Sequence, residues 1–285
     1  LTPPFETPEM KKTPAIRSAK DAASRTLPPQ SRIEKIDKPK HTLVITGIPR
    51  SGTSLICSLL NELPEVVAFN EIFYDVHNLP RALNEMRQRL ISGAPVPNKY
   101  GSNGKLAADT MDMTKILHKR QDPTSQDVII ATNVNVPYLL QARVIASFGC
   151  PIVAMVRDPF YTVASFCSKR ASIIPEAQVG PAPLPTHPRW QAFDFKGRTP
   201  TERRAEVWNY IAGMICGNKI PFFHYENLIE DTAGTIREIL NMTAYHQMRI
   251  PQFSLNSGNI QHGEMDHIRD AVDRFAPNRK LLGYT

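Results

Sequence analysis

The sequence has few cysteines and no long apolar run. Only four of its 285 residues are cysteine, and no two of them form a C-x-x-C pair or lie near histidines at metal-ligand spacing (Cys57, Cys150, Cys167 and Cys216). Free thiols in a reducing compartment are therefore expected, which favours a cytoplasmic location over secretion. No stretch has the apolar length that a secretory signal or a membrane span requires. The start at Leu1, without methionine, is expected of a piece cut from a longer protein.

Acidic residues are outnumbered, and arginine-rich runs interleaved with aromatic residues are missing. Lysine and arginine total 34 against 27 aspartate and glutamate, which gives a net charge of +7. This balance favours an anionic ligand but does not by itself separate a nucleotide from nucleic acid, a membrane surface or an acidic polymer. The missing arginine and aromatic runs argue against nucleic acid as the partner.

The stretch 41–60 holds the clearest functional signal. Residues 42–45 are an apolar run typical of a strand buried on both faces, residues 47–54 break it, and Leu55 resumes an apolar pattern with helical spacing. A chain that leaves a parallel strand through glycines directly into a helix points backbone N–H groups and the positive end of the helix dipole at one spot. This predicts an anion site, although a glycine turn between any strand and helix of an α/β protein has the same local pattern.

The loop lacks the lysine of a Walker A sequence. Gly47 and Gly52 have the spacing of G-x-x-x-x-G-K-[ST], but Thr53 stands where the lysine should be, and Arg50 is the only long cation. A nucleoside triphosphatase would also need an acidic residue at the end of another strand to hold magnesium. The best apolar strand elsewhere ends in Arg157 instead. Two cations suit a polyanion better than a magnesium triphosphate, so we expect no metal at the site.

Segments of strand and helix type alternate along the chain, which predicts an α/β fold with a parallel sheet. Residues 1–40 are expected to be an extended or flexible N-terminal segment, followed by one domain of residues 41–285. The proline-rich stretch 171–198 is predicted to be a lid or an acceptor-binding loop, with surface padding as the alternative. The expected strands are 42–45, 66–69, 127–131, 152–156 and 220–224. The expected helices are 54–63, 79–90, 137–148, 232–240 and 265–275. Two more helices are expected to begin at Pro159 and at Pro200, the second of them after a capping box.

Polar side chains follow two of these strands. Glu71 comes just after the second strand and is expected at the carboxyl edge of the sheet, where ligands bind in open α/β folds. Arg157 ends another strand, and Ser165 follows about two helical turns later, so both could face one ligand. The alternative is that Arg157 pairs with a carboxylate and Ser165 is merely a tolerated helix serine.

These motifs resemble a known family. Residues 48–54, Ile-Pro-Arg-Ser-Gly-Thr-Ser, look like the phosphosulfate loop of the sulfotransferases that use 3′-phosphoadenosine 5′-phosphosulfate (PAPS), in particular the branch with P-R-S-G-T-[TS]. Residues 156–159, Val-Arg-Asp-Pro, with Ser165 resemble that family's 3′-phosphate site, and residues 225–228, Tyr-Glu-Asn-Leu, are similar to its Y-E-D-L segment. The blocks stand in the family's order across residues 42–240.

The resemblance implies a three-layer P-loop-type fold and a sulfotransferase that needs no metal. It implies that PAPS is the donor and adenosine 3′,5′-bisphosphate (PAP) the product. Arg50 and the main-chain amides of residues 51–54 would carry the charge on the 5′ side of the nucleotide. Arg157 and Ser165 would bind the 3′-phosphate, and Tyr225 would lie beside the adenine. The loop residues in this prediction are Ser51, Gly52, Thr53 and Ser54.

The same resemblance points to a hydroxyl acceptor, either a small molecule or a group on a polymer. Glu71 matches the glutamate that some branches keep as the base, and residues 132–136 lack the histidine and the lysine that other branches place there. Its alternative role is to neutralise Arg50. We expect Lys169 or another basic residue of 171–198 to support the sulfonate, and residues 256–258 to form a loop near the 3′-phosphate. An ATP-dependent P-loop kinase and a non-catalytic nucleotide- or polyanion-binding module remain the alternative functions.

Overall fold

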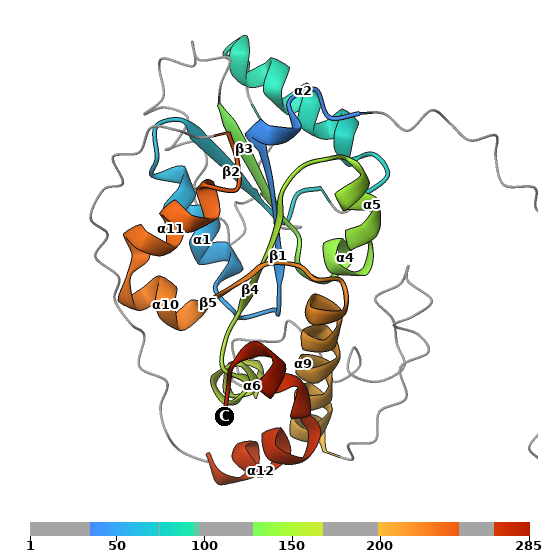
Figure 1. Cartoon of the computed structure of the whole chain (residues 1–285), viewed down its shortest axis with the longest axis vertical. Coiled ribbons are helices and arrows are strands. Elements are labelled where there is room, and N and C mark those ends of the chain that lie inside the picture. Colours follow the sequence, from blue (N-terminus) through green and yellow to red (C-terminus); the bar gives the residue numbers. More distant parts are fainter. Residues whose placement is uncertain (1–34, 74, 95, 97–127, 168–198, 245–264) are drawn as a thin grey trace, which may run out of the picture. The chain divides into compact units, whose positions relative to one another are not determined.

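The computed structural model describes residues 35–73, 75–94, 96, 128–167, 199–244 and 265–285 (Figure 1). By their contacts, residues 35–285 form one compact unit. In chain order, the described elements are η1 (Pro39–His41), β1 (Thr42–Gly47), α1 (Thr53–Asn61), β2 (Val66–Asn70), α2 (Leu79–Ile91), β3 (Ile129–Asn133), α4 (Asn135–Leu140), α5 (Ala142–Ser147), β4 (Ile152–Val156), α6 (Pro159–Cys167), α9 (Pro200–Gly217), β5 (Phe222–His224), α10 (Tyr225–Glu230), α11 (Thr232–Leu240), α12 (Asp266–Phe275) and η2 (Pro277–Leu282).

The five described strands form one parallel sheet in the order β2-β3-β1-β4-β5. β1 lies at the centre, where Ile45 is paired with Asn133 of β3 on one side and with Val153 of β4 on the other. All six residues of β1 are buried, as expected of a strand covered on both faces. The predicted three-layer α/β fold of the P-loop type, with a central parallel sheet flanked by helices, is confirmed.

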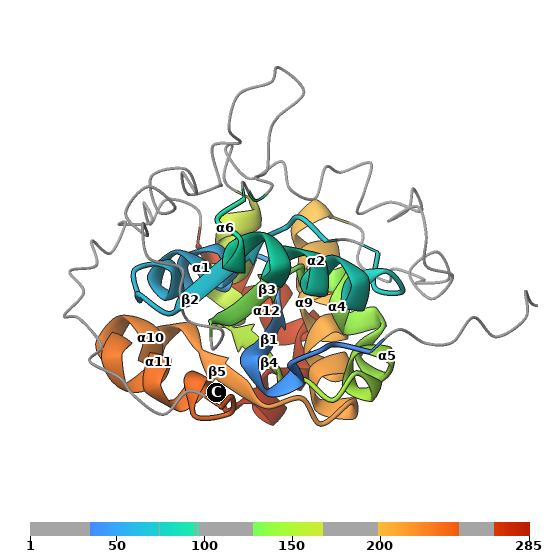
Figure 2. The same ribbon diagram turned by 90° about the horizontal axis from the view of Figure 1, so that it is seen from above.

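Alternate side chains of the strands contact helices on opposite faces of the sheet. Leu43 and Ile45 lie in a buried cluster with residues of α1 and α11, whereas Val44 lies in a cluster with residues of α2, α4 and α5. Successive strand residues point to opposite faces, so this alternation produces the two outer layers. Figures 1 and 2 show α1, α10 and α11 on one side of the sheet and α4, α5 and α9 on the other.

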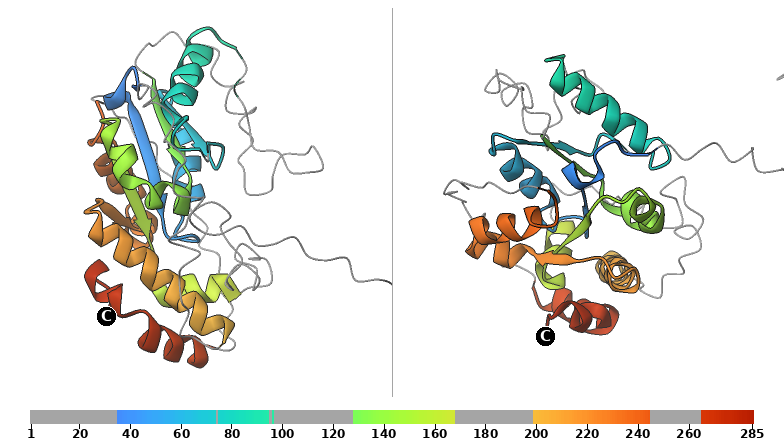
Figure 3. Two further views of the ribbon diagram at one scale, coloured as in Figure 1. Left: turned by 90° about the vertical axis from the view of Figure 1, so that its right-hand side faces the viewer. Right: turned by 45° about the horizontal axis from the view of Figure 1, so that its top comes forward.

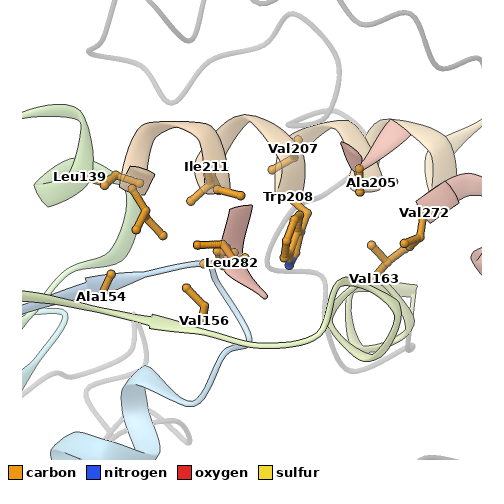
Figure 4. Close-up of a cluster of buried hydrophobic side chains, with 14 of the residues drawn as sticks. Leu139, Ala154, Val156, Val163, Ala205, Val207, Trp208, Ile211, Val272 and Leu282 are labelled. Atoms are coloured by element: carbon orange, nitrogen blue, oxygen red, sulfur yellow. The ribbon is translucent and has the colours of Figure 1, made fainter. Parts of the chain in front are cut away.

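Helix α9 packs on the half of the sheet that contains β4. The predicted capping box, formed by Thr199 and Glu202, is present at its start, and one face of the helix is buried (Trp208, Ile211, Ala212 and Ile215). Figure 4 shows Trp208 and Ile211 on the side of α9 that faces Ala154 and Val156 of β4. Helices α6 and α12 also pack against α9 and complete this cluster (Figure 3).

Several predicted boundaries differ from the structure. The helix expected at 137–148 is two helices, α4 and α5, because Gln141 leaves helical geometry with φ −113° and ψ 22°. A new helix start forms there, since the Gln141 carbonyl accepts hydrogen bonds from Val144 and Ile145. β3 continues two residues further than expected, to Asn133. β5 begins only at Phe222, after Pro221, which has no N–H to donate to the sheet.

The chain just before β1 belongs to the unit of residues 35–285. Ile36 is buried, and the Asn84 side chain of α2 hydrogen-bonds the Lys35 carbonyl and the Asp37 N–H. All four cysteines are free, as expected: Cys57 and Cys150 are buried, whereas the other two are half-buried (Cys167 and Cys216). Within the described ranges, no helix has both the length and the apolar character needed to cross a membrane.

Candidate functional site

All five described strands end at one edge of the sheet, and the chain leaves two adjacent strands there in opposite directions. After β1 it enters α1 on one face, and after β4 it enters α6, which packs with α9 on the other face. In open α/β sheets, this divergence creates a crevice at the carboxyl ends of the strands. The loop after β1 and the segment after β4 are the two stretches in which the sequence predicts anion-binding residues.

The loop after β1 turns tightly before α1 begins. The Ser51 N–H donates to the Ile48 carbonyl, and both Arg50, with φ 70°, and Gly52, with φ 85°, adopt left-handed backbone conformations. The first helical hydrogen bond of α1 runs from the Ile56 N–H to the Gly52 carbonyl. The N–H groups of Thr53 and Ser54 precede that bond and have no acceptor in the helix. The amides that α1 offers to an anion therefore begin after Ser51, whose own N–H is used inside the turn.

The side chains of the predicted loop residues have different surroundings. The Ser51 side chain is 0% exposed, and its Oγ makes no hydrogen bond to any described residue. Thr53 is 4% exposed, so its contribution to a ligand is its main-chain N–H. A buried hydroxyl without a hydrogen-bond partner, next to uncapped helix amides, lowers the stability of the fold, so stability does not explain a serine at this position. The donor set of hydroxyl and N–H groups fits a phosphate or sulfonate group.

Arg50, Arg157 and Ser165 lie close together beside the loop after β1. The Arg50 Nε donates a 3.0 Å hydrogen bond to the Ser165 Oγ, across 115 positions of sequence. The Arg157 Nη1 lies 3.5 Å from the Arg50 carbonyl. Arg50 is exposed, and its terminal guanidinium nitrogens make no hydrogen bond to a described residue. Two neighbouring cations repel each other, so a bound polyanion would offset that repulsion.

Tyr225, the first residue of α10, lies between the loop and Arg157. The Arg157 guanidinium carbon lies 4.4 Å from the centre of the Tyr225 ring and 5.9 Å from that of Tyr161, which places the cation over both aromatic side chains. The same Tyr225 ring packs against Gly52: a Cβ at Gly52 would be 2.5 Å from the ring Cδ2. Tyr225 therefore contacts both the loop after β1 and the segment after β4.

Gly52→Ala is expected to destabilise the protein more than the same change at a glycine with free space. Both Gly52 and Gly93 have left-handed φ, which costs an alanine about 1–2 kcal/mol. An alanine Cβ at Gly93 would meet nothing within 4 Å, whereas at Gly52 it would overlap Tyr225. Urea unfolding of Gly52→Ala and of the control Gly93→Ala measures the difference. Equal losses of unfolding free energy in the two variants would show that the overlap with Tyr225 does not lower stability.

The backbone of Arg157 and Asp158 is held from two other elements, α9 and α10. The Trp208 Nε1 of α9 donates to the Arg157 carbonyl at 3.2 Å, and the Asp158 N–H donates to the Glu226 Oε1 of α10 at 3.0 Å. The Tyr284 hydroxyl donates to the Glu226 Oε2 at 3.0 Å. These contacts fix the start of α6 and so the direction from which Arg157 reaches the site.

This network contains groups with shifted pKa values. Burial raises the pKa of the Asp158 carboxyl, and the nearby Glu226 charge raises it further, while the hydrogen bond from the Phe160 N–H opposes the shift. Burial, followed by the Glu226 charge, also raises the pKa of the Tyr284 hydroxyl. Tyr284 therefore keeps its proton and remains the donor to Glu226.

Glu71 follows β2 and lies at the predicted edge of the sheet. It is half-buried, adopts φ 52°, and its N–H donates to the Asn133 carbonyl at 2.7 Å. Burial raises the pKa of the Cys57 thiol in α1, and the Glu71 charge adds to that shift. A left-handed conformation at a non-glycine residue is strained and is typical of functional sites.

Sequence patterns did not identify several side chains that support the site. Asn70 and Asn133 at the ends of β2 and β3, Glu226, Tyr284 and the indole nitrogen of Trp208 act through contacts between distant segments. The Tyr-Glu-Asn-Leu segment predicted a role for Tyr225 but none for Glu226. Lys169, residues 171–198 and residues 256–258 lie outside the described residues, so those expectations stay predictions.

The fold defines the class of protein: a three-layer α/β protein of the P-loop type. No protein-family profile matches the chain, and no curated protein sequence matches it. Among solved structures, the chain is similar to the sulfotransferase domain from the Synechococcus PCC 7002 olefin synthase, at 13% identity and a TM-score of 0.44. The match covers 91% of this chain and 99% of that domain. A likeness this distant does not carry the activity of that domain to this chain.

Proposed function

We propose that the protein is a sulfotransferase that moves a sulfuryl group from PAPS to a hydroxyl acceptor. The observation that carries this proposal is the cluster of Arg50, Arg157, Ser165 and Tyr225 around the start of α1. It places two cations, an uncapped helix N-terminus and an aromatic ring at one crevice. PAPS, when bound, supplies the sulfuryl group and leaves as PAP.

The loop after β1 binds the 5′ side of the nucleotide in this proposal. The N–H groups of Thr53 and Ser54 and the positive end of the α1 dipole attract negative charge there. The Arg50 guanidinium lies at the same loop and stabilises the charge that builds up on the leaving phosphate. Its hydrogen bond to Ser165 uses the Nε, so the terminal nitrogens can donate to the ligand.

The segment after β4 binds the 3′-phosphate. Arg157 supplies the charge, and Trp208 and Glu226 hold the backbone on which its side chain stands. Tyr225 packs on the Arg157 guanidinium and keeps it in place. Since Arg157 and the loop after β1 lie on either side of Tyr225, the two phosphate ends of one nucleotide can be held from adjacent strands.

Glu71 is the proposed base that takes the proton of the acceptor hydroxyl. It lies at the same edge of the sheet as the loop after β1, and its backbone is held by the Asn133 carbonyl. A carboxylate in a half-buried place can accept a proton from a hydroxyl held within hydrogen-bond reach. The acceptor class in this proposal is a hydroxyl on a small molecule or a polymer.

Calorimetric titration with PAP in the presence of a metal chelator tests this function. We expect binding without magnesium, because cationic side chains and amides supply the charge. The same cell titrated with ATP separates the kinase alternative, which requires ATP to bind only when magnesium is added. Transfer of labelled sulfate to a panel of hydroxyl acceptors separates an enzyme from a binding module.

A structure of the PAP complex supplies the opposing outcome. The proposal requires the two phosphate ends of PAP to lie beside Arg50 and Arg157. Phosphate groups found anywhere else on the protein would refute it. Binding of ATP with magnesium and no binding of PAP would support a P-loop kinase instead.

A further inference from the structure

Two buried asparagines join the ends of β2 and β3 to the first turn of α1. The Asn133 Nδ2 donates to the Asn70 Oδ1 at 2.7 Å, and the Asn70 Nδ2 donates to the Ser54 Oγ at 3.1 Å. Asn133 is 0% exposed and Asn70 is 8% exposed. These three side chains therefore form a relay from the interior of the sheet to the loop after β1.

The two hydrogen bonds of this relay run in the same direction, from Asn133 to Asn70 and from Asn70 to Ser54. The Asn70 amide receives a hydrogen bond on its oxygen and gives one from its nitrogen, so Ser54 is reached by a donor. A hydroxyl has a single hydrogen to donate, and that of Ser54 must point away from Asn70. No described residue accepts it. Ser54 is the second residue of α1, where the free N–H groups also converge.

Asn133 has a second contact with the same site. Its main-chain carbonyl accepts the Glu71 N–H at 2.7 Å, so one residue holds both the proposed base and the relay. The Asn133 Oδ1 itself is buried without a partner among the described residues. An unpaired buried carbonyl opposes stability, so packing alone does not account for an asparagine at this place.

We infer that Asn70 and Asn133 are positioning residues that turn the Ser54 hydroxyl outward, so that it donates to the 5′ phosphate of the nucleotide. This inference rests on the proposed function. It goes beyond the loop sequence, because the direction of the Ser54 hydroxyl at the start of the helix is set by side-chain amides on two neighbouring strands.

Asn70→Asp reverses this polarity with little change of shape. A carboxylate only accepts hydrogen bonds, so the substituted side chain would accept from Asn133 and also from Ser54, whose hydrogen would then turn inward. The Ser54 oxygen lone pairs would face the anion in place of the hydrogen. We expect PAP affinity to fall roughly 10- to 100-fold, the size of one hydrogen bond to a charged group.

A double-mutant cycle separates this effect from simple charge repulsion. The dissociation constant of PAP is measured by calorimetry for the wild type, Ser54→Ala, Asn70→Asp and the double variant. If Asn70 acts through the hydroxyl, Asn70→Asp weakens binding far less in the Ser54→Ala background than in the wild type. Asn70→Ala is a second variant that adds no charge. We expect it to weaken PAP binding less than Asn70→Asp does when Ser54 is present, and not to weaken it in the Ser54→Ala background.

Asn61→Asp is the matched control on the same two elements. The Asn61 amide bridges α1 to β2 through both polar atoms of Ala68 and is buried, so its replacement lowers thermal stability and leaves PAP affinity unchanged. An equal loss of affinity from Asn70→Asp in both backgrounds would overturn the relay and leave the proposed function standing. A wild-type protein that does not bind PAP would overturn both.

Discussion

Arg50→Ala is expected to abolish turnover and leave the fold intact. The Arg50 guanidinium is exposed at the loop after β1, so its removal leaves no cavity in the core. Loss of one charge-stabilising donor at a transition state typically costs about 3 kcal/mol, or roughly a hundredfold in rate or more. Steady-state sulfuryl transfer measures the loss, and circular dichroism checks the fold.

Backbone strain has to be separated from the loss of the guanidinium. Arg50 has φ 70°, which costs alanine about 1–2 kcal/mol, whereas glycine adopts this conformation freely. Arg50→Gly should therefore lose the same activity as Arg50→Ala and retain more stability. Arg237→Ala, an exposed arginine change on α11, is the matched control and should keep full activity. Near-normal turnover of both Arg50 variants would eliminate the assigned role.

Glu71→Gln is expected to lower kcat about 10²- to 10⁴-fold with PAP affinity preserved, since glutamine keeps the shape of the side chain and cannot take up the acceptor proton. The change is measured as kcat at saturating acceptor, together with the dissociation constant of PAP. A loss confined to kcat identifies a base.

The alternative role of Glu71 gives the opposite pattern. If the carboxylate only neutralises Arg50, its removal changes the affinity for the nucleotide and leaves kcat close to that of the wild type. Glu71→Asp retains a carboxylate on a shorter side chain and serves as the comparison variant. A base has to reach the acceptor, so this variant should also lose kcat, though less than Glu71→Gln.

Local sequence patterns predicted the segments of the site because each segment is a short piece of chain with its own signal. The apolar run before Gly47 and the helical spacing after Ser54 fixed a strand, a turn and a helix. Pro159 marked the start of α6 directly after the strand that ends before Arg157. The placement of Glu71 at the carboxyl edge also followed from the strand before it.

The contacts between those segments could not be predicted in the same way. Arg50 and Ser165 are 115 positions apart. Gly52 contacts Tyr225 only because α10 follows β5, which lies next to β4 in the sheet. The sequence placed Ser165 two helical turns after Arg157, but it did not predict that the Ser165 hydroxyl is hydrogen-bonded to Arg50. The break at Gln141 also escaped the pattern, because apolar residues continue on both sides of it.

The sequence by itself determined the parallel α/β class, the uncapped glycine turn before α1 and the residue types that are proposed to bind an anion, since these depend on spacing along a few residues. The tertiary structure decided which side chains meet: Tyr225 against Gly52 and Arg157, and Asn133 through Asn70 to Ser54. The physical reason is that strand order brings residues together through the sheet, and hydrogen-bond direction depends on the partner that a side chain finds there.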